Sequence, residues 1–439
     1  MNFKQARNHV AQIFRHVLNA VDPERLTANA IALDGDSLVI HGTRHLLHPG
    51  GRIVLLGVGK SSVGMARGVE SVLGSRLDHG LVVTKRGLAS QASSLDRTRV
   101  IEASHPVPDQ SSVDAGVRLL EEARGLMADD IAIVVVSGGG SALVEAPVEG
   151  VSLEDFRITT DLLLRAGSDI WTLNAVRRHL SRIKAGGLAR AIAPARVVNL
   201  ILSDVLGNPL RVIASGLSVD ADDDESDRID WVMRSDVRQK LPGTVRDRLS
   251  TSISREGSEL NVVQTTVVGD AALAARAASQ AAADLGYRPY QVGVRFAGEA
   301  REFGRFWSQL ALSTAHGDTN FERPCCIIGA GEMTVTVRGN GVGGRNTEMA
   351  AAAALEIQGE SEIAIASLAT DGDDGFSQAA GGVVDGQTVR RLLDQGIDPA
   401  ELLDQNDTRP FLEAANGLIV TGQSGTNVND LYLSLISKP

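Results

Sequence analysis

The stretch IAIVVVSGGGSALVEAP (131–147) joins an uninterrupted apolar run to three consecutive glycines and then to a helix-like segment. Three other apolar runs also read as strands: RIVLLGVG (52–59), HGLVVTK (79–85) and VVNLILSDVLGN (197–208). Apolar strands that alternate with helical segments are typical of a parallel sheet covered on both faces. The sequence therefore predicts an α/β fold whose first domain is a Rossmann-like, doubly wound parallel sheet.

The second half of the chain alternates less regularly. It begins with the strand-like run ELNVVQTTVVG (259–269) and continues with SEIAIASLATDGDDG (361–375), a strand that ends in an acidic loop. We expect CCIIGAGEMTVTVRG (325–339) to form two strands that break at the glycines 329–331. These patterns predict a second α/β domain with a mixed sheet.

The segment DADDDESD (220–227) is the sharpest change of composition along the chain. Acidic runs of this kind are usually solvated loops, so we place the domain boundary shortly after it. The predicted domains are residues 1–245 and 246–439.

Composition excludes several classes of protein. Lys and Arg number 43 against 54 Asp and Glu, and aromatic residues make up only 3%, which disfavours nucleic-acid binding. No apolar run reaches the roughly 18 residues of a membrane span, and the first residues do not form a signal peptide. The adjacent Cys325 and Cys326 fit core packing in a reducing compartment, so we expect a cytoplasmic protein. A homodimer is compatible with these features.

The first candidate site is Gly57-Val-Gly59-Lys60-Ser61, between a strand and a helix start. A Walker loop needs another Gly where Val54 stands, and a Rossmann fingerprint needs one where Ser62 stands. Small residues at a helix N-terminus nevertheless favour a bound anion, and Lys60 adds a positive charge. The alternative is a surface lysine on a tight turn.

The second candidate is Ser137-Gly138-Gly139-Gly140-Ser141, which fits a phosphate-binding turn. The alternative is a plain strand-to-helix turn with a serine N-cap. Asp204 ends another buried strand, where ligands bind in such sheets, and could hold Mg²⁺ or accept a hydroxyl proton. Its alternative role is to cap the next turn.

The second domain supplies further candidates. Gly343 and Gly344 precede Arg345 and Asn346 at a helix start, a pattern that suits a polyphosphate, and Glu332 could bind a metal or a hydroxyl. The alternative for Arg345 is an exposed arginine near the helix cap.

Acidic and basic clusters complete the set. Asp371 and Asp374 belong to a loop of three carboxylates that fits either magnesium or a solvated turn. The helical segment LNAVRRHLSRIKAGGLA (173–189) could face an anionic substrate or solvent, with equal weight for both. His105 is more typical of a structural histidine than of a catalytic one.

Taken together in this order, the motifs resemble the class II glycerate kinases, whose C-terminal part is the MOFRL domain. The matching strings include VGKSSVGMA, SHPVPD, VVVSGGGSALVEAP, LILSDVLGN, GEMTVTVRGNGVGGRNTE, ATDGDDG and TGQSGTNVNDL. The resemblance spans most of the chain. It implies a kinase that uses ATP and Mg²⁺ to convert D-glycerate into 2-phosphoglycerate. Because several candidate ligand loops depart from the family pattern, a closely related sugar acid is the alternative acceptor.

Residue by residue, the resemblance points to Lys60, Asp204 and Arg345 as the catalytic set. The glycines and hydroxyl residues of the loops around them are the expected nucleotide and substrate contacts. Asp204, Asp371 and Asp374 are the expected metal ligands. Two other functions remain open: a hydroxypyruvate reductase that uses NAD(P)H, supported only by Gly57 and Gly59, and a sensor of nucleotides or sugar acids that has no ATP turnover.

Overall fold

The computed structural model describes residues 2–88, 94–220, 225–251 and 260–438. The chain forms two compact units. One unit, here the central unit, comprises Pro23–Val268, and the other, here the terminal unit, combines Met1–Asp22 with Gly269–Pro439. Part of the acidic segment 220–227, namely residues 221–224, lies outside the described residues.

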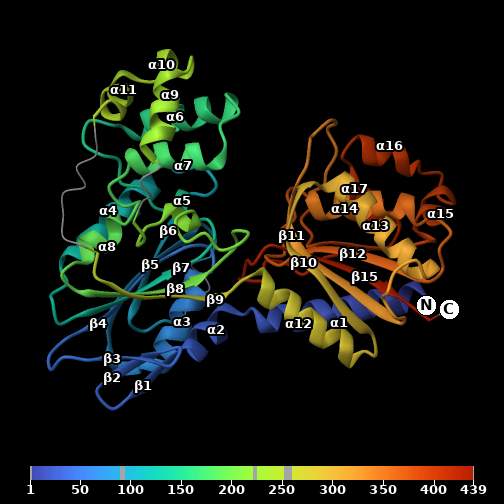
Figure 1. The fold of residues 1–439 in the computed structure, drawn as a ribbon, viewed down its shortest axis with the longest axis horizontal. Helices are drawn as coiled ribbons and strands as arrows, with labels where there is room; N and C mark the ends of the chain where they lie inside the picture. Colours follow the sequence, from blue (N-terminus) through green and yellow to red (C-terminus); the bar gives the residue numbers. More distant parts are fainter. Residues whose placement is uncertain (1, 89–93, 221–224, 252–259, 439) are drawn as a thin grey trace. The chain divides into compact units, whose positions relative to one another are not determined.

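The central unit contains a six-stranded sheet in the order β6-β5-β4-β7-β8-β9 (Figure 1). Its strands are β4 (Ile53–Val58), β5 (Leu77–Lys85), β6 (Thr98–Ala103), β7 (Ile131–Val136), β8 (Arg196–Leu202) and β9 (Val262–Gly269). β4 pairs in parallel with β5 and β7, and the pairs β5–β6 and β7–β8 are also parallel. The predicted parallel α/β sheet is confirmed.

Helices cover both faces of this sheet. α3 (Ser62–Leu73) packs on β4, β5 and β7, whereas α4 (Gln110–Arg124) contacts β5 and β6 and α8 (Gly187–Ile192) contacts β8. Side chains of β4 alternate between the faces, so that Leu56 joins the core under α4 and α8. Completely buried strands such as IAIVVV therefore follow from a sheet with no solvent-facing side.

The remaining elements of the central unit form two smaller groups. Near its start lie α2 (Pro23–Ala30) and the antiparallel strands β1 (Ile31–Asp34), β2 (Ser37–Ile40) and β3 (Thr43–Leu46). The helical group, which shares a separate apolar core, comprises α6 (Leu153–Arg165), α7 (Ile170–His179), α9 (Glu225–Arg234), α10 (Val237–Lys240) and α11 (Gly243–Leu249). The four-residue helix α5 (Gly140–Leu143) and the 3₁₀ turns Gly74–Arg76 and Ile213–Ser215 lie in connections.

The terminal unit has a mixed six-stranded sheet in the order β10-β11-β15-β12-β13-β14. Its strands are β10 (Arg288–Glu299), β11 (Cys325–Thr334), β12 (Ile363–Ala369), β13 (Gly381–Asp385), β14 (Leu418–Ile419) and β15 (Asp430–Ile436). Only the β10–β11 pair is parallel. The predicted mixed sheet is confirmed, and Cys325 and Cys326 are buried in it as expected.

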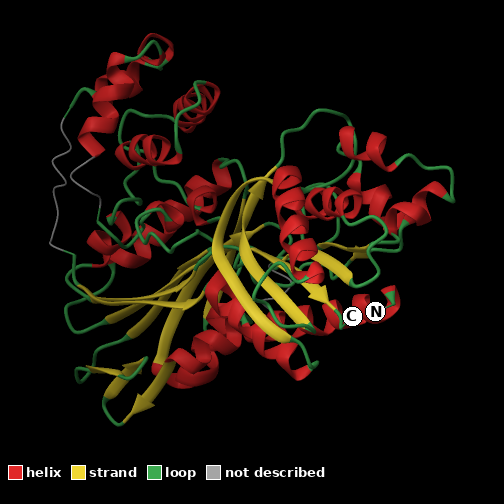
Figure 2. Cartoon of the chain, turned by 45° about the vertical axis from the view of Figure 1, so that its right-hand side comes forward, coloured by secondary structure: helices red, strands yellow, loops and turns green. Residues whose placement is uncertain are grey.

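Helices lie on both sides of this sheet too (Figures 1 and 2). α1 (Phe3–Ala20) and α12 (Ala271–Asp284) pack together on one side, and α13 (Ala300–His316) and α14 (Arg345–Glu356) pack together on the other. α15 (Thr388–Leu393), α16 (Pro399–Asp404) and α17 (Thr408–Ala414) surround α14. Within the part of the chain that the structure describes, no helix has the length and apolarity that crossing a bilayer requires.

The limits of the two units differ from the boundary that we expect near residue 245. Val245 is fully buried in the helical group, so the chain cannot separate there. The segment that follows belongs to the central sheet, because the Val197 amide donates to Asn261 O at 2.8 Å and β9 lies beside β8. At the other end, α1 packs on α12 and joins the terminal unit. Amphipathic periodicity predicts that α1 is a helix but does not reveal which core it covers.

β11 is one continuous strand, so the expected break at the glycines 329–331 is wrong. Gly329 and Gly331 instead make room for neighbours. A Cβ atom at Gly329 would lie 2.7 Å from the Trp307 ring, and one at Gly331 would lie 2.1 Å from Phe296 O. Glycine in a strand often marks such a close approach rather than a turn.

Gly331→Ala should lower the melting temperature of the protein strongly, because the new methyl group would collide with backbone atoms that cannot move independently. Overpacking of this kind typically costs about 1–3 kcal/mol or more. Gly243→Ala is the matched control, since its nearest neighbour would be an Arg246 side-chain atom at 3.9 Å. Equal melting temperatures for the two variants would contradict the packing described for β11.

Candidate active site

Backbone amides of the turn after β4 form hydrogen bonds to the ends of the neighbouring strands. Three consecutive amides donate at 2.9–3.0 Å: Gly59 to Val83 O, Lys60 to Gly138 O, and Ser61 to Ser137 Oγ. The sequence led us to expect these amides to face an anion, and their use within the protein corrects that view. What this turn can offer to a ligand is the half-buried side chain of Lys60.

The glycines of this turn serve packing. A Cβ at Gly57 would lie 2.3 Å from the Val135 side chain, and one at Gly59 would lie 2.1 Å from Ser137 Oγ. Gly59 also has φ +133°, which L side chains rarely adopt. Gly57 and Gly59 therefore allow the strand ends to meet, and Ser61 is buried beneath them.

Three residues considered in the sequence analysis, Lys60, His105 and Asp204, lie around the three glycines that follow β7. A Cβ at Gly138 would overlap Asp204 Oδ2, at 1.9 Å, so the carboxylate lies directly against this glycine. A Cβ at Gly139 would lie 2.9 Å from the His105 ring and 3.4 Å from Lys60 Cγ. Within the central unit, Lys60, His105 and Asp204 thus surround the same two glycines.

His105 is neutral in this environment. Burial, together with the positive charges of Lys60 and Lys85, lowers the pKa of His105 to about 4, and burial is the largest of these causes. At neutral pH the cluster therefore contains one lysine, one carboxylate and one uncharged imidazole. An uncharged ring can donate one hydrogen bond and accept another.

Ser141, which directly follows the three glycines, belongs to a series of hydrogen-bonded side chains. Ser141 Oγ lies 2.8 Å from Ser215 Oγ, and Ser215 Oγ donates to Asn174 Oδ1 at 3.4 Å. Ala214 and Ser215 have φ of +49° and +57°. Residues other than glycine seldom adopt this conformation, and such strain concentrates at functional sites.

The basic helical segment is not a solvated face. Arg178, His179 and Lys184 are 6%, 5% and 2% exposed, respectively. Lys184 Nζ forms an ion pair with Glu145, and both side chains are completely buried. The solvent-facing alternative for this segment is therefore wrong.

In the terminal unit, Arg345 is held by two carboxylates. Its Nε and Nη2 donate to Asp430 at 2.5 and 2.9 Å, and its Nη1 lies 3.4 Å from Glu332 Oε1. Asn429 Nδ2 donates to the other Glu332 oxygen at 3.2 Å. Asp430 is 1% exposed whereas Arg345 is 26% exposed, so the buried carboxylate orients a guanidinium that still reaches the surface.

The glycine-rich loop before Arg345 is packed against the segment 405–408. A Cβ would lie 2.5 Å from backbone at Gly339 and Gly341, and 2.2 Å from Thr408 Oγ1 at Gly343. Loop amides also donate within the protein, including Gly341 to Gln405 O and Val342 to Asp407 Oδ1. The loop that we expected to hold a polyphosphate instead positions the start of α14.

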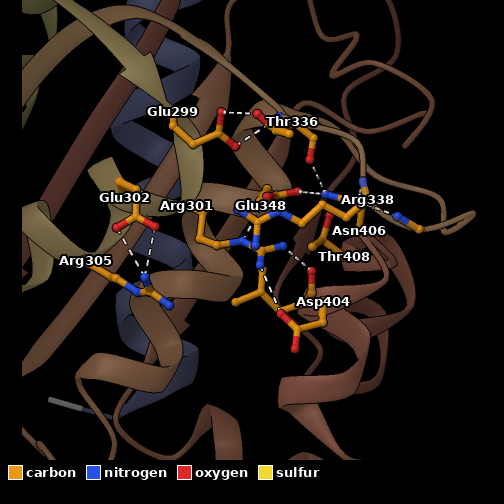
Figure 3. Close-up of polar contacts among 12 residues, drawn as sticks. Glu299, Arg301, Glu302, Arg305, Thr336, Arg338, Glu348, Asp404, Asn406 and Thr408 are labelled. Carbon is orange, nitrogen blue, oxygen red and sulfur yellow. Dashed lines mark hydrogen bonds and ion pairs between the residues drawn. The ribbon is translucent and has the colours of Figure 1, made fainter.

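A buried polar network fixes this arrangement (Figure 3). Arg301 Nε donates to Glu348 Oε1 at 3.2 Å, and Asn406 Nδ2 donates to Glu348 Oε2 at 2.8 Å. Asn406 Oδ1 in turn accepts from the amides of Arg338 and Gly339 at 2.7 and 3.1 Å. Glu348 lies one turn after Arg345 on α14, so the network connects that helix to the preceding loop.

Asp374 caps α14. Its carboxylate oxygens accept from the amides of Asn346 and Thr347 at 2.9 and 2.8 Å and from the side chains of both residues. Burial raises the pKa of Asp374 to about 6. Asn346 is buried as well and accepts from Ser367 Oγ at 2.6 Å. A carboxylate saturated by helix donors is a poor metal ligand, so the geometry favours a cap over the metal role that we expect from the sequence.

The other expected ligands of a metal are more exposed. Asp371 is half-buried and accepts from the Asp373 amide at 3.0 Å, while Asp373 faces solvent. Asp204 is half-buried beside Gly138. Among the described residues, no group of three or more His, Cys, Asp or Glu side chains could hold a metal ion.

Sequence reasoning missed Asp430 and Asn429. Both follow TGQSGTNV near the end of the chain, and an aspartate directly before the apolar run LYLSLI was the available signal. It also did not single out Ser215, nor Asn174 within the segment 173–189. Their importance depends on contacts between distant parts of the chain.

Lys60→Met should raise the pKa of His105 above its value of about 4, because it removes a positive charge that disfavours the imidazolium. The measurement is a pH titration of the histidine ring signals by NMR. The His105 signal is assigned as the one that is absent from His105→Gln. Lys240→Met, at an exposed position, is the control and should leave the pKa unchanged. An unshifted His105 in Lys60→Met would contradict the proximity of the two side chains.

Comparisons with known proteins agree on one family. Residues 9–250 match a family model described as "Domain of unknown function (DUF4147)", and residues 325–430 match the MOFRL family. A Pyrococcus horikoshii protein named "Glycerate 2-kinase" is 35% identical over 96% of this chain and 95% of its own length. A protein of Agrobacterium vitis named "Putative hydroxypyruvate reductase" is also 35% identical, over 99% of this chain and 95% of its own.

A solved structure is similar as well. The crystal structure of a glycerate kinase from Thermotoga maritima superimposes with a TM-score of 0.87 and 34% sequence identity. The match covers 99% of this chain and all of that one. The chain therefore belongs to the glycerate kinase family that carries the MOFRL domain, and it is a kinase.

Proposed function

We propose that this kinase transfers the γ-phosphate of ATP to D-glycerate, or to a closely related sugar acid, in a reaction that requires Mg²⁺ and yields 2-phosphoglycerate. The observation that carries this proposal is the cluster of Lys60, His105 and Asp204 around Gly138 and Gly139. The names of the Pyrococcus and Thermotoga relatives support the choice of acceptor.

Phosphoryl transfer demands positioning and charge stabilisation more than covalent chemistry from the protein. Lys60 offers a positive charge beside the triglycine, where negative charge on the migrating group would be stabilised. Asp204 lies against Gly138, where its carboxylate can orient an acceptor hydroxyl and accept its proton. The neutral imidazole of His105 can contribute hydrogen bonds without adding to the positive charge.

The residues also fit a metal that arrives with the nucleotide. Mg²⁺ in nucleotide sites is usually held by one or two carboxylates together with phosphates and waters. Asp204 is the carboxylate in the right surroundings for this, and Asp371 is a second candidate in the terminal unit. When bound, the ion would neutralise phosphate charge.

Arg345 is the proposed catalytic residue of the terminal unit. Its bidentate pairing with the buried Asp430 fixes the plane of the guanidinium, and the Nη1 edge lies beside the half-exposed Glu332. We propose that Asp430 acts as a positioning residue, since it contacts Arg345 from the buried side. Gly343, Gly344 and Asn346 then act on the ligand through the placement of Arg345.

Hydroxypyruvate reduction with NAD(P)H is the second candidate, because relatives in Agrobacterium vitis are named for that activity. The turn after β4 argues against a dinucleotide site. Gly57 is packed between Val82 and Val135, and the amides of Gly59 and Lys60 are used within the protein. Oxidation of NADH in the presence of hydroxypyruvate would favour this alternative.

Lys60→Met should reduce kcat for phosphorylation of D-glycerate on the order of 10²–10⁴, the usual effect of removing a preorganised charged group. Asp204→Asn should reduce it similarly. The assay follows ATP consumption with Mg²⁺, and ³¹P NMR identifies which hydroxyl carries the phosphate. Chelation of Mg²⁺ should abolish turnover of the wild type.

The exposed Lys240→Met is the matched control and should retain wild-type turnover. Near-normal kcat for Lys60→Met at saturating ATP would refute its catalytic role. A ³¹P spectrum that shows phosphate on the 3-hydroxyl would refute the proposed product while leaving the kinase assignment intact.

Asp430→Asn should lower kcat roughly 10–100-fold, because the amide accepts only one of the two Arg345 bonds and leaves the guanidinium less well oriented. The KM for ATP and the KM for D-glycerate should change less than kcat does. Asp394→Asn, on the exposed surface of the same unit, serves as the control. A fall in melting temperature without any change in kcat would show that Asp430 is purely structural.

A further inference from the structure

The buried basic cluster of the central unit has more positive than negative charge. Arg177 and Lys184 interact electrostatically with each other and with a single carboxylate, Glu145. Glu145 is committed to Lys184 by the buried ion pair and accepts the Ala146 amide as well. These groups leave one positive charge without a matching negative charge in a poorly solvated place.

Arg177 carries that unmatched charge. Its Nε is buried and has no hydrogen-bond acceptor among the described residues. Burial lowers the pKa of Arg177, and the charge of Glu145 offsets this only in part. A half-buried guanidinium whose charge is only partly compensated is costly, and an anion that binds there would relieve this cost.

Neutral polar groups stand next to this cation. Asn174 is one helical turn before Arg177 on α7, so the two side chains share a face. Asn174 accepts from Ser215 Oγ, and Ser215 Oγ contacts Ser141 Oγ. Ala214 and Ser215 adopt left-handed conformations, which are strained for residues other than glycine. This strain is an independent sign that the segment around Ser215 has a functional role.

The location also matches the geometry of a short hydroxy acid. In a 2-hydroxy acid, one carbon–carbon bond separates the carboxylate carbon from the carbon that bears the hydroxyl. Asp204, which we assign to the hydroxyl, lies against Gly138, and Ser141 is at the other end of the same glycine turn. A group that binds the carboxylate must therefore be close to this turn.

We propose that Arg177, together with Ser141 and Asn174, binds the carboxylate of the acceptor hydroxy acid. The identity of that acid rests on the proposed function, but the site itself does not. A carboxylate is favoured over a triphosphate because only one positive charge is unmatched and because the planar guanidinium fits a carboxylate with two parallel hydrogen bonds.

Arg177→Gln should raise the KM for D-glycerate about 10–100-fold, the effect of losing a charge-assisted hydrogen bond. The KM for ATP should stay within about twofold of the wild type, which separates a carboxylate site from a phosphate site. Arg177→Lys keeps the charge but not the planar fork, so it should have an intermediate KM. Arg165→Gln, at a side chain that is 78% exposed on α6, is the matched control.

A binding experiment tests the same site without turnover. Lactate, a 2-hydroxy acid, should raise the melting temperature of the wild type but not that of Arg177→Gln. Glycerol at the same concentration should change the melting temperatures of both proteins equally. Equal stabilisation of both proteins by lactate would overturn the proposal. So would a larger effect of Arg177→Gln on the KM for ATP than on the KM for D-glycerate.

Ser141→Ala is a second variant in case Arg177→Gln does not fold. Ser141 is only half-buried, and the loss of one neutral hydrogen bond should raise the KM for D-glycerate several-fold. An unchanged KM in Ser141→Ala and in Arg177→Lys would overturn the proposal. If the wild type does not phosphorylate D-glycerate but lactate binding still depends on Arg177, the proposed acceptor is wrong and the carboxylate site stands.

Discussion

The hydrogen bond from the Lys60 amide to Gly138 O joins the ends of two adjacent parallel strands, and the candidate site of the central unit depends on it. β4 and β7 are paired in register, so their C-terminal ends arrive at the same edge of the sheet. The Ser61 amide reinforces the connection through Ser137 Oγ. The Lys60 side chain therefore begins beside the triglycine, where His105 and Asp204 also lie.

Much of this arrangement could be predicted from the sequence, because local patterns determine it. Buried parallel strands appear as apolar runs, and residues directly after them must lie at the ligand-binding edge. This reasoning places Lys60, Gly138 and Asp204 correctly at strand ends. Local patterns could not predict the packing of α1 on α12 or the position of β9 beside β8. Both depend on which of the two hydrophobic cores the element covers.

The glycines show where such reasoning reaches its limit. A cluster of glycines indicates that something approaches the backbone closely, and at Gly138 and Gly139 that neighbour includes candidate catalytic side chains. At Gly339, Gly341 and Gly343 the neighbour is another segment of the chain. The two cases look alike in the sequence, because the residue that needs the space lies far away along the chain.

The sequence also does not reveal which charged side chains pair with each other. This pairing differs between the cluster around Arg345 and the cluster around Arg177. Arg345 is matched by Asp430 and Glu332, so its surroundings are already rich in negative charge. Among the described residues, Arg177 Nε has no hydrogen-bond acceptor, and the neighbouring Glu145 forms its ion pair with Lys184. A low-dielectric interior makes each unmatched charge costly, so the balance of charge indicates which ligand a site can stabilise. The carboxylates beside Arg345 therefore favour a guanidinium held in one orientation, whereas the charge balance around Arg177 favours an anion. Two arginines that look interchangeable in a sequence thus differ in charge balance because of the carboxylates that the fold brings to them.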